Sequence, residues 1–317
     1  MIKVEHLVKA FGPRKAVDDV SFEVEKGTVL GFLGPNGAGK TTTIRMIAGY
    51  LPPTSGRVWV NGTEVGENPV AAQKMIGYMP ENTPLYDEMT VSGFMKFIAE
   101  LRGLCGKERD RRVDEVLEAC MLGAVRHQPI DTLSKGYRRR TCLAQTLIHD
   151  PPVLLLDEPT EGLDPNQKQV VRDMIGKMSR EKIIMLSTHV LEEVEAVCTR
   201  AMIISEGRLK ADGTPAELKK RGASYNVLTI ELLAPAQEAV AAFGSISDVE
   251  RVETLESSGE KVALRLVPRD RQSLAVSAIE TAVRRKWMVV GMRTEAGRLD
   301  EVFRQITTTA DVERKTA

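Results

Sequence analysis

The segment from residue 28 to residue 41 constrains the fold more than any other part of the chain. A continuous apolar run begins at Thr28, as in a strand covered on both faces, and leads into a glycine-rich loop that ends at Lys40 and Thr41. The loop fits the pattern GxxxxGK[ST], which requires a strand before it and a helix after it. Its glycines let backbone N–H groups surround phosphate oxygens, and the helix start adds partial positive charge. The sequence therefore predicts an α/β fold that binds phosphate at this loop.

Within this loop, Lys40 is expected to reach the β- and γ-phosphates of a nucleotide, and the Thr41 hydroxyl is expected to bind Mg²⁺. The residues predicted to contact the nucleotide here are Gly34, Pro35, Asn36, Gly37, Ala38, Gly39, Lys40, Thr41 and Thr42.

Two carboxylates stand at the end of a second apolar strand, Val153–Asp157. Alone, Asp157 and Glu158 fit a strand that runs into a solvated turn. Together with the phosphate loop they predict a hydrolytic site, in which Asp157 holds Mg²⁺ and Glu158 orients and deprotonates the attacking water.

The rest of the first 220 residues fits this α/β interpretation. Alternating residues at 2–8 and 20–24 predict an opening antiparallel sheet. Helical periodicity then predicts a helical subdomain at about 86–150. A strand at 182–187 follows a helix at about 166–179, and this alternation predicts parallel pairing.

The length and the pattern after residue 220 predict a second domain, 221–317. The chain has 317 residues, more than one domain usually contains. Strands are expected at 225–232, 249–255 and 261–267, with helices at 235–243 and 271–286. The simplest interpretation is the βαββαβ order of a small α+β, ferredoxin-like domain.

Composition narrows the class of protein. Lys plus Arg and Asp plus Glu number 44 each, so no net charge attracts the chain to nucleic acid, and no nucleic-acid partner is expected. The four cysteines include no CxxC pair, which favours neither a zinc site nor a disulfide framework. No secretion signal or apolar membrane-spanning run is recognised, so any membrane span is expected from a partner.

Residues 1 to about 218 resemble the nucleotide-binding domain of ATP-binding cassette (ABC) proteins. Phe11 stands where that family has an aromatic that stacks on adenine, and Leu133–Tyr137 stands where it has the LSGGQ signature. Gly162–Pro165 occupies the D-loop position, and His189 occupies the position of the switch histidine that contacts the γ-phosphate. The resemblance implies an ATP hydrolase with Glu158, His189 and Lys40 as catalytic residues and with ATP and Mg²⁺ as cofactors.

The signature segment implies a dimer, because in the family it faces the γ-phosphate bound by the other subunit. The residues expected to do so are Ser134, Lys135, Gly136 and Tyr137. Ser134 is also a good helix N-cap, which by itself explains the residue. Lys135 and Tyr137 depart from LSGGQ, in a form associated with ABC-2-type exporters. The run Arg138–Arg140 is expected to form a solvated helix face without a role in the site.

Glu81 is the departure that matters most, because the family usually has a glutamine there that touches Mg²⁺ or the attacking water. A glutamate keeps an oxygen ligand and adds negative charge, so Glu81 joins Thr41 and Asp157 as an expected metal ligand. Gliding-motility-like and other ABC-2-type export ATPases also carry glutamate at this position.

The leading interpretation is a cytoplasmic ATPase on the inner face of the membrane. It would form a homodimer, or pair with a related ATPase, and drive export through a separate polytopic ABC-2-type permease. Residues 223–317 more weakly resemble the C-terminal domain of drug-export ATPases, which implies regulation or dimer stabilisation. A soluble cassette ATPase acting on nucleic acid, ribosomes or cofactor assembly is the main alternative. Chromosome and repair ATPases of the family carry a long coiled-coil insertion between the positions of Lys40 and Asp157, and this chain has no such insertion. An importer subunit and a nonhydrolytic module are less favoured.

Overall fold

The computed structural model describes residues 1–316, with side chains described as far as Thr307. The chain divides into two compact units, one built on Met1–Pro215 and the other on Ala216–Thr309. From the sequence, the boundary was expected at residue 220.

The first unit contains two sheets. An antiparallel sheet in the order β2-β1-β4-β5 contains β1 (Ile2–Phe11), β2 (Arg14–Val24), β4 (Ser55–Val60) and β5 (Thr63–Glu64). It opens the chain as predicted, although β1 and β2 are longer than expected. Its buried side chains include Ile2, Val4 and Leu7, which join a core shared with the second sheet.

The second sheet has the order β10-β9-β3-β8-β7-β6 and carries the phosphate loop. Every pairing is parallel except that of β9 with β10. Its strands are β3 (Val29–Leu33), β6 (Ile76–Met79), β7 (Val153–Asp157), β8 (Ile183–Thr188), β9 (Arg200–Ser205) and β10 (Arg208–Gly213). Strands β3, β7 and β8 are buried along their whole length, as their apolar sequences predict. Because β3 pairs with β8 and β8 with β7, the carboxyl ends of these three strands meet at one edge.

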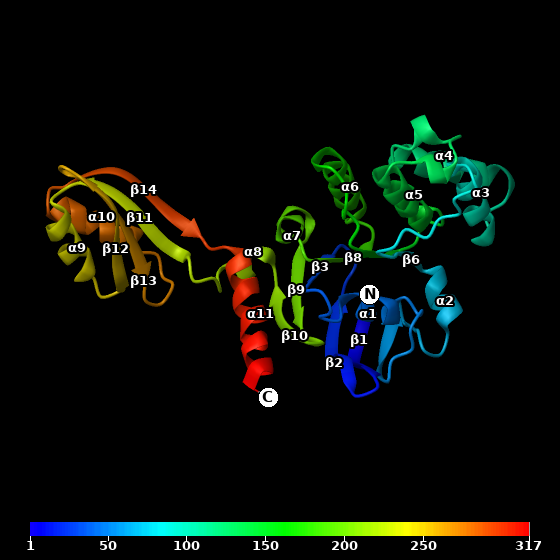
Figure 1. Ribbon diagram of the computed structural model, residues 1–317, viewed down its shortest axis with the longest axis horizontal. Helices are drawn as coiled ribbons and strands as arrows, with labels where there is room; N and C mark the ends of the chain where they lie inside the picture. Colours follow the sequence, from blue (N-terminus) through cyan, green and yellow to red (C-terminus); the bar gives the residue numbers. More distant parts are fainter. Residues whose placement is uncertain (317) are drawn as a thin grey trace. The chain divides into compact units, whose positions relative to one another are not determined.

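Helices cover this sheet and form a separate helical group (Figure 1). The group contains α3 (Val91–Leu101), α4 (Gly106–Ala119) and α5 (Lys135–Leu147), within the predicted subdomain. Ser134 caps α5 by accepting the N–H of Tyr137 at 3.4 Å. The other helices of this region are α1 (Lys40–Ile47), α2 (Pro69–Lys74), α6 (Pro165–Met178), α7 (Leu191–Val197) and α8 (Pro215–Lys219), the last of which crosses the boundary between the units.

The second unit has the predicted βαββαβ order. Its antiparallel sheet, β12-β13-β11-β14, is that of a ferredoxin-like fold, which confirms the predicted fold class. Phe243 of α9 and Ala278 and Ala282 of α10 pack into its core. Trp287 packs against the same core, its ring centroid 6.0 Å from that of Phe243. The elements are β11 (Tyr225–Leu233), α9 (Ala236–Gly244), β12 (Val249–Ser258), β13 (Lys261–Pro268), α10 (Ala275–Arg284), β14 (Met288–Ala296) and α11 (Leu299–Thr316).

Within residues 1–316, no helix combines the length and the apolar character that crossing a membrane requires.

Candidate functional site

The phosphate loop connects β3 to α1 and lines a cavity of about 600 Å³. Gly39 caps α1 with a φ of 108°, and a β-carbon at this position would lie 2.4 Å from the carbonyl oxygen of Ala16. Only glycine therefore fits at the start of the helix. The cavity is lined by Phe11, Arg14, Ala16, Pro35, Asn36, Gly37, Gly39, Lys40, Thr41, Thr42, Glu81 and Glu158.

The remaining two loop residues support this cavity. Gly34 accepts a hydrogen bond from the Lys40 ammonium, and Ala38 is buried, with its N–H donated to the carbonyl of Pro35 at 3.2 Å. The structure thus brings the whole predicted loop together with Phe11. The Phe11 ring is 53% exposed, and the ammonium of Lys9 lies 5.3 Å from its centroid.

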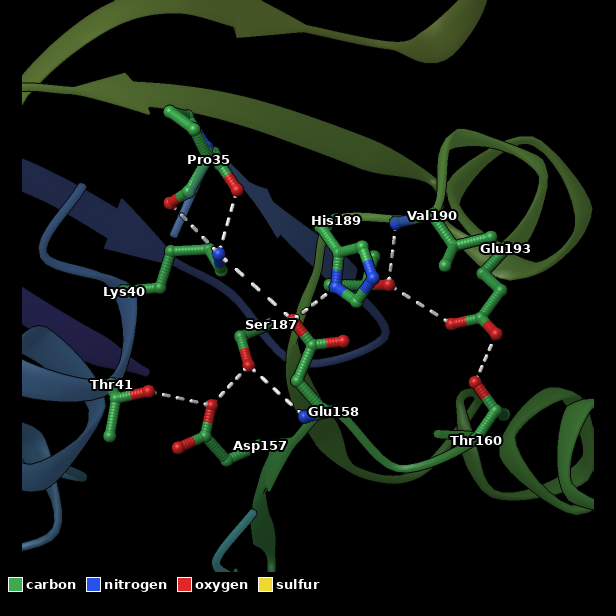
Figure 2. A network of polar contacts seen from close by, with 12 residues as sticks. Pro35, Lys40, Thr41, Asp157, Glu158, Thr160, Ser187, His189, Val190 and Glu193 are labelled. Atoms are coloured by element: carbon green, nitrogen blue, oxygen red, sulfur yellow. Dashed lines mark hydrogen bonds and ion pairs between the residues drawn. The ribbon is translucent and has the colours of Figure 1, made fainter. Parts of the chain in front are cut away.

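Lys40 is buried, and its ammonium lies inside the loop (Figure 2). It donates to the carbonyl oxygens of Gly34 at 2.7 Å and Pro35 at 3.2 Å, and lies 4.0 Å from a carboxylate oxygen of Glu158. Burial lowers the pKa of Lys40, while the nearby carboxylates of Glu158, Asp157 and Glu81 oppose that shift. A partly desolvated cation at this position is suited to bind an anion.

Asp157 ends β7 with no exposed surface. Its Oδ1 accepts the Thr41 hydroxyl at 3.2 Å and also a hydrogen bond from the Ser187 hydroxyl (Figure 2). Its Oδ2 is buried and has no hydrogen-bond partner among the described residues. An unsatisfied buried carboxylate oxygen next to a threonine hydroxyl fits a hard divalent cation such as Mg²⁺.

Glu158 follows Asp157 with a φ of 49°, in the left-handed region that non-glycine residues rarely adopt. Its N–H is donated to the Ser187 hydroxyl at 3.1 Å, and its carboxylate lies 3.0 Å from Nδ1 of His189. Burial raises the pKa of Glu158 above its ordinary value, although the hydrogen bond from His189 opposes the shift. A buried carboxylate that faces the phosphate loop and has a raised pKa is suited to accept a proton.

Glu81 follows β6, the parallel neighbour of β7, and lines both the phosphate-loop cavity and a second cavity of about 570 Å³. Lys135 lines the second cavity, which also includes Arg138, Arg139 and Glu161. The four signature residues Ser134, Lys135, Gly136 and Tyr137 are not among the residues that line the phosphate-loop cavity.

The signature glycine and tyrosine have structural contacts of their own. A β-carbon on Gly136 would lie 2.3 Å from the side-chain oxygen of Gln167, so α5 approaches α6 at this point. The Tyr137 ring faces the guanidinium of Arg140 at 4.4 Å from its centroid.

The expectation for the arginine run was wrong. Arg139 and Arg140 are buried, and only Arg138 keeps substantial exposure. Arg140 donates to the carbonyls of Cys120 and Met121, while Arg139 turns towards the end of β7. A run of charged residues marks a solvated face only when the helix packs against the protein on one side. Helix α5 is packed on several sides, so it buries both guanidinium groups against backbone carbonyls.

Sequence reasoning also missed Arg14 and Ala16, which line the cavity from β2. No motif marks them, because the pairing of β1 with β2 brings them beside the loop.

The chain is similar to known proteins in sequence and in fold. The family model described as ABC transporter matches residues 17–161. The linearmycin resistance ATP-binding protein LnrL of Bacillus subtilis is 30% identical over 97% of this chain and 98% of its own length. The probable multidrug ABC transporter ATP-binding protein YbhF of Escherichia coli is 37% identical over 71% of this chain. The aligned part spans only 39% of YbhF.

A solved structure described as the ATP-binding subunit of an ABC transporter superposes with a TM-score of 0.65 at 29% identity, covering 70% of this chain and 92% of that one. Together with the match to LnrL along nearly its whole length, these similarities show that the chain belongs to the ABC transporter family, as one of its ATP-binding subunits.

Proposed function

We propose that the cavity at the carboxyl ends of β3, β7 and β8 hydrolyses ATP with Glu158 as the general base. The observation that carries this proposal is the position of the Glu158 carboxylate. It lies 4.0 Å from the Lys40 ammonium and 3.0 Å from the His189 ring, in a cavity lined by the phosphate loop. A γ-phosphate bound by the loop would come within reach of all three groups.

In the proposed reaction, a water oxygen attacks the γ-phosphorus, and the bond to the β–γ bridging oxygen breaks to give ADP and phosphate. Glu158 accepts a proton from the water. Lys40 and the loop N–H groups stabilise the charge on the phosphoryl oxygens, and His189 holds the Glu158 carboxylate and contacts the γ-phosphate. Phe11 stacks on adenine.

Mg²⁺ would be held by Thr41 and Asp157, with Glu81, which lines the same cavity, as a further oxygen ligand. The ion would neutralise phosphate charge when bound. The partnerless Oδ2 of Asp157 supports this assignment.

Dimerisation is supported by the position of the signature residues. Ser134, Lys135, Gly136 and Tyr137 lie outside the phosphate-loop cavity of their own chain, so in this proposal they contact ATP bound by a second subunit. That subunit is a second copy or a related ATPase. The capped N-terminus of α5 supplies N–H groups and partial positive charge for the γ-phosphate.

The closing and opening of this dimer would drive a separate polytopic permease of the ABC-2 type, with the ATPase on the inner face of the cytoplasmic membrane. The names of LnrL and YbhF refer to drug resistance and multidrug transport, which supports export. The second unit would stabilise or regulate the dimer.

The test is to purify tagged Glu158→Gln protein from detergent-solubilised membranes in the presence of ATP. Loss of hydrolysis with retained ATP binding, together with recovery of a polytopic membrane protein, would support the proposal. Hydrolysis at the parental rate would remove Glu158 from its role, and recovery of soluble partners alone would argue against the transporter assignment.

A further inference from the structure

Arg139 is a buried cation in the first unit whose contacts are backbone carbonyl oxygens. It lies on α5, is 4% exposed, and has no carboxylate within ion-pair distance among the described residues. Its guanidinium donates to the carbonyl of Asp157 at 3.2 Å and to that of Pro159 at 3.5 Å. It also donates to the carbonyls of Glu158 and Glu81. A buried guanidinium is tolerated only where its N–H groups are satisfied, and here two separate segments satisfy them.

Through these contacts, the backbone of Glu158 is held by hydrogen bonds on both sides. On its N-terminal side, the Glu158 N–H is donated to the carbonyl and the hydroxyl of Ser187, at 3.2 and 3.1 Å. On its C-terminal side, its carbonyl accepts from Arg139. A residue with a φ of 49° keeps that conformation only when its surroundings hold it. The two supports together fix the direction in which the Glu158 side chain leaves the backbone.

The same guanidinium also fixes Glu81. The Glu81 carbonyl accepts a hydrogen bond from Arg139, and Glu81 lines the phosphate-loop cavity together with Glu158. The backbones of two residues proposed for catalysis and metal binding, Glu158 and Glu81, therefore accept hydrogen bonds from one side chain of α5.

We infer that Arg139 is a positioning residue for hydrolysis, which holds Glu158 and Glu81 at their working geometry without touching the nucleotide. This inference rests on the proposed role of Glu158 as the general base. It predicts a larger effect on kcat than on ATP affinity, because no hydrogen bond or ion pair among the described residues joins Arg139 to the phosphate loop.

The experiment compares steady-state ATP hydrolysis and thermal unfolding of the parent and of Glu158→Gln with those of four further variants. In Arg139→Met, kcat is expected to fall roughly 10- to 100-fold, the effect of a misplaced catalytic group, while KM for ATP changes less than about twofold. Arg139→Lys keeps a buried cation with fewer donors and is expected to recover part of kcat. Arg112→Met is the matched control, because Arg112 also donates to two backbone carbonyls, those of Leu147 and Ile148 at the opposite end of α5. It is expected to lower thermal stability and leave kcat near the parental value.

The fourth variant combines Arg139→Met with Glu158→Gln. If Arg139 acts through Glu158, Arg139→Met lowers kcat by a much smaller factor in the Glu158→Gln background than in the parent, and any loss that remains reflects Glu81. An equal fold-loss in both backgrounds would overturn the inference, and so would a parental kcat in Arg139→Met. If Arg139→Met does not fold, Arg139→Lys decides: a kcat and KM both unchanged from the parent would also overturn it. Parental hydrolysis by Glu158→Gln would instead contradict the proposed function, so the two failures are distinguishable.

Discussion

The two units of the chain bury different kinds of side chain. The first encloses Lys40, Arg139, Asp157, Glu158 and Glu193, whereas Ser224 is the one polar side chain buried among the described residues of the second. Buried charges are costly unless their surroundings compensate for them, and each of these has polar partners at or beside the candidate site. Arg140 is also buried in this unit, against the carbonyls of Cys120 and Met121. The second unit has an apolar core of the kind that packing alone explains. The difference fits the proposed chemistry in the first unit and a core built by packing in the second.

Neutralising a buried charge should produce the largest effect on activity. Glu158→Gln is expected to lower kcat by about 10²- to 10⁴-fold, since it removes the proton acceptor. Glu231→Gln in the second unit is the matched control, because the Glu231 carboxylate forms a surface ion pair with Lys261 at 2.8 Å and is not one of the buried charges of the first unit. Its kcat should equal that of the parent in a steady-state ATPase assay. A comparable loss in both variants would break the distinction between the units.

Removing an apolar side chain from the core of the second unit should lower stability and leave hydrolysis unchanged, the reverse of the pattern expected for Glu158→Gln. Phe243→Ala is expected to lower the free energy of unfolding of that unit by about 3–5 kcal/mol, because a fully buried ring leaves a cavity. Fluorescence of Trp287, which lies beside Phe243, reports the transition in a background where Trp59 is replaced by Phe. Hydrolysis below the unfolding temperature should be unchanged. A fall in kcat that parallels the loss of stability would show that the second core supports the site.

The dependence of hydrolysis on pH sharpens the comparison further. Burial raises the pKa of Glu158, and a base works only when it is ionised. As the pH is lowered, kcat should therefore begin to fall at a higher pH than it would with an ordinary glutamate, whose pKa is about 4.3. His189 opposes the shift, so His189→Ala should move the acid limb to still higher pH. The measurement is kcat at saturating ATP across the acidic and neutral range. An acid limb near 4.3 that His189→Ala leaves in place would contradict the assignment.

The smallest expected effect concerns a helix cap. Ser134→Ala should cost about 1 kcal/mol in stability, and Thr90→Ala should cost about the same, because each hydroxyl accepts the N–H three residues later. If Ser134 also contacts ATP on a second subunit, only Ser134→Ala should weaken ATP-dependent dimerisation of the Glu158→Gln protein. Sedimentation with and without ATP separates the two variants, and identical behaviour would reduce Ser134 to its role as a cap.

The sequence predicted the parts of the fold in which one local pattern determines the outcome. The apolar run before Gly34 and the strand ending at Asp157 were predicted because parallel strands buried on both faces are continuously apolar. The βαββαβ order followed from alternation and helical periodicity in the same way. Strands β4, β5, β6, β9 and β10 were not predicted.

The parts that the sequence missed depend on tertiary placement. Arg14 lines the cavity because β2 pairs with β1, and Arg139 is buried because α5 packs against the ends of β6 and β7. A run of three arginines has the same local pattern whether its helix faces solvent or carbonyls. Contacts among distant segments decide between these outcomes.

The order of strands in the parallel sheet has a consequence for synthesis of the chain. Strand β3, which leads into the phosphate loop, lies between β8 and β9, whose residues come about 150 positions or more later. The backbone of Glu158 likewise gains its N–H partner only when Ser187 of β8 is present. A growing chain that has emerged through β7 thus already contains the lysine and both carboxylates. It still lacks the strand that orients Glu158, so the ribosome must add β8 before a nascent chain can hydrolyse ATP.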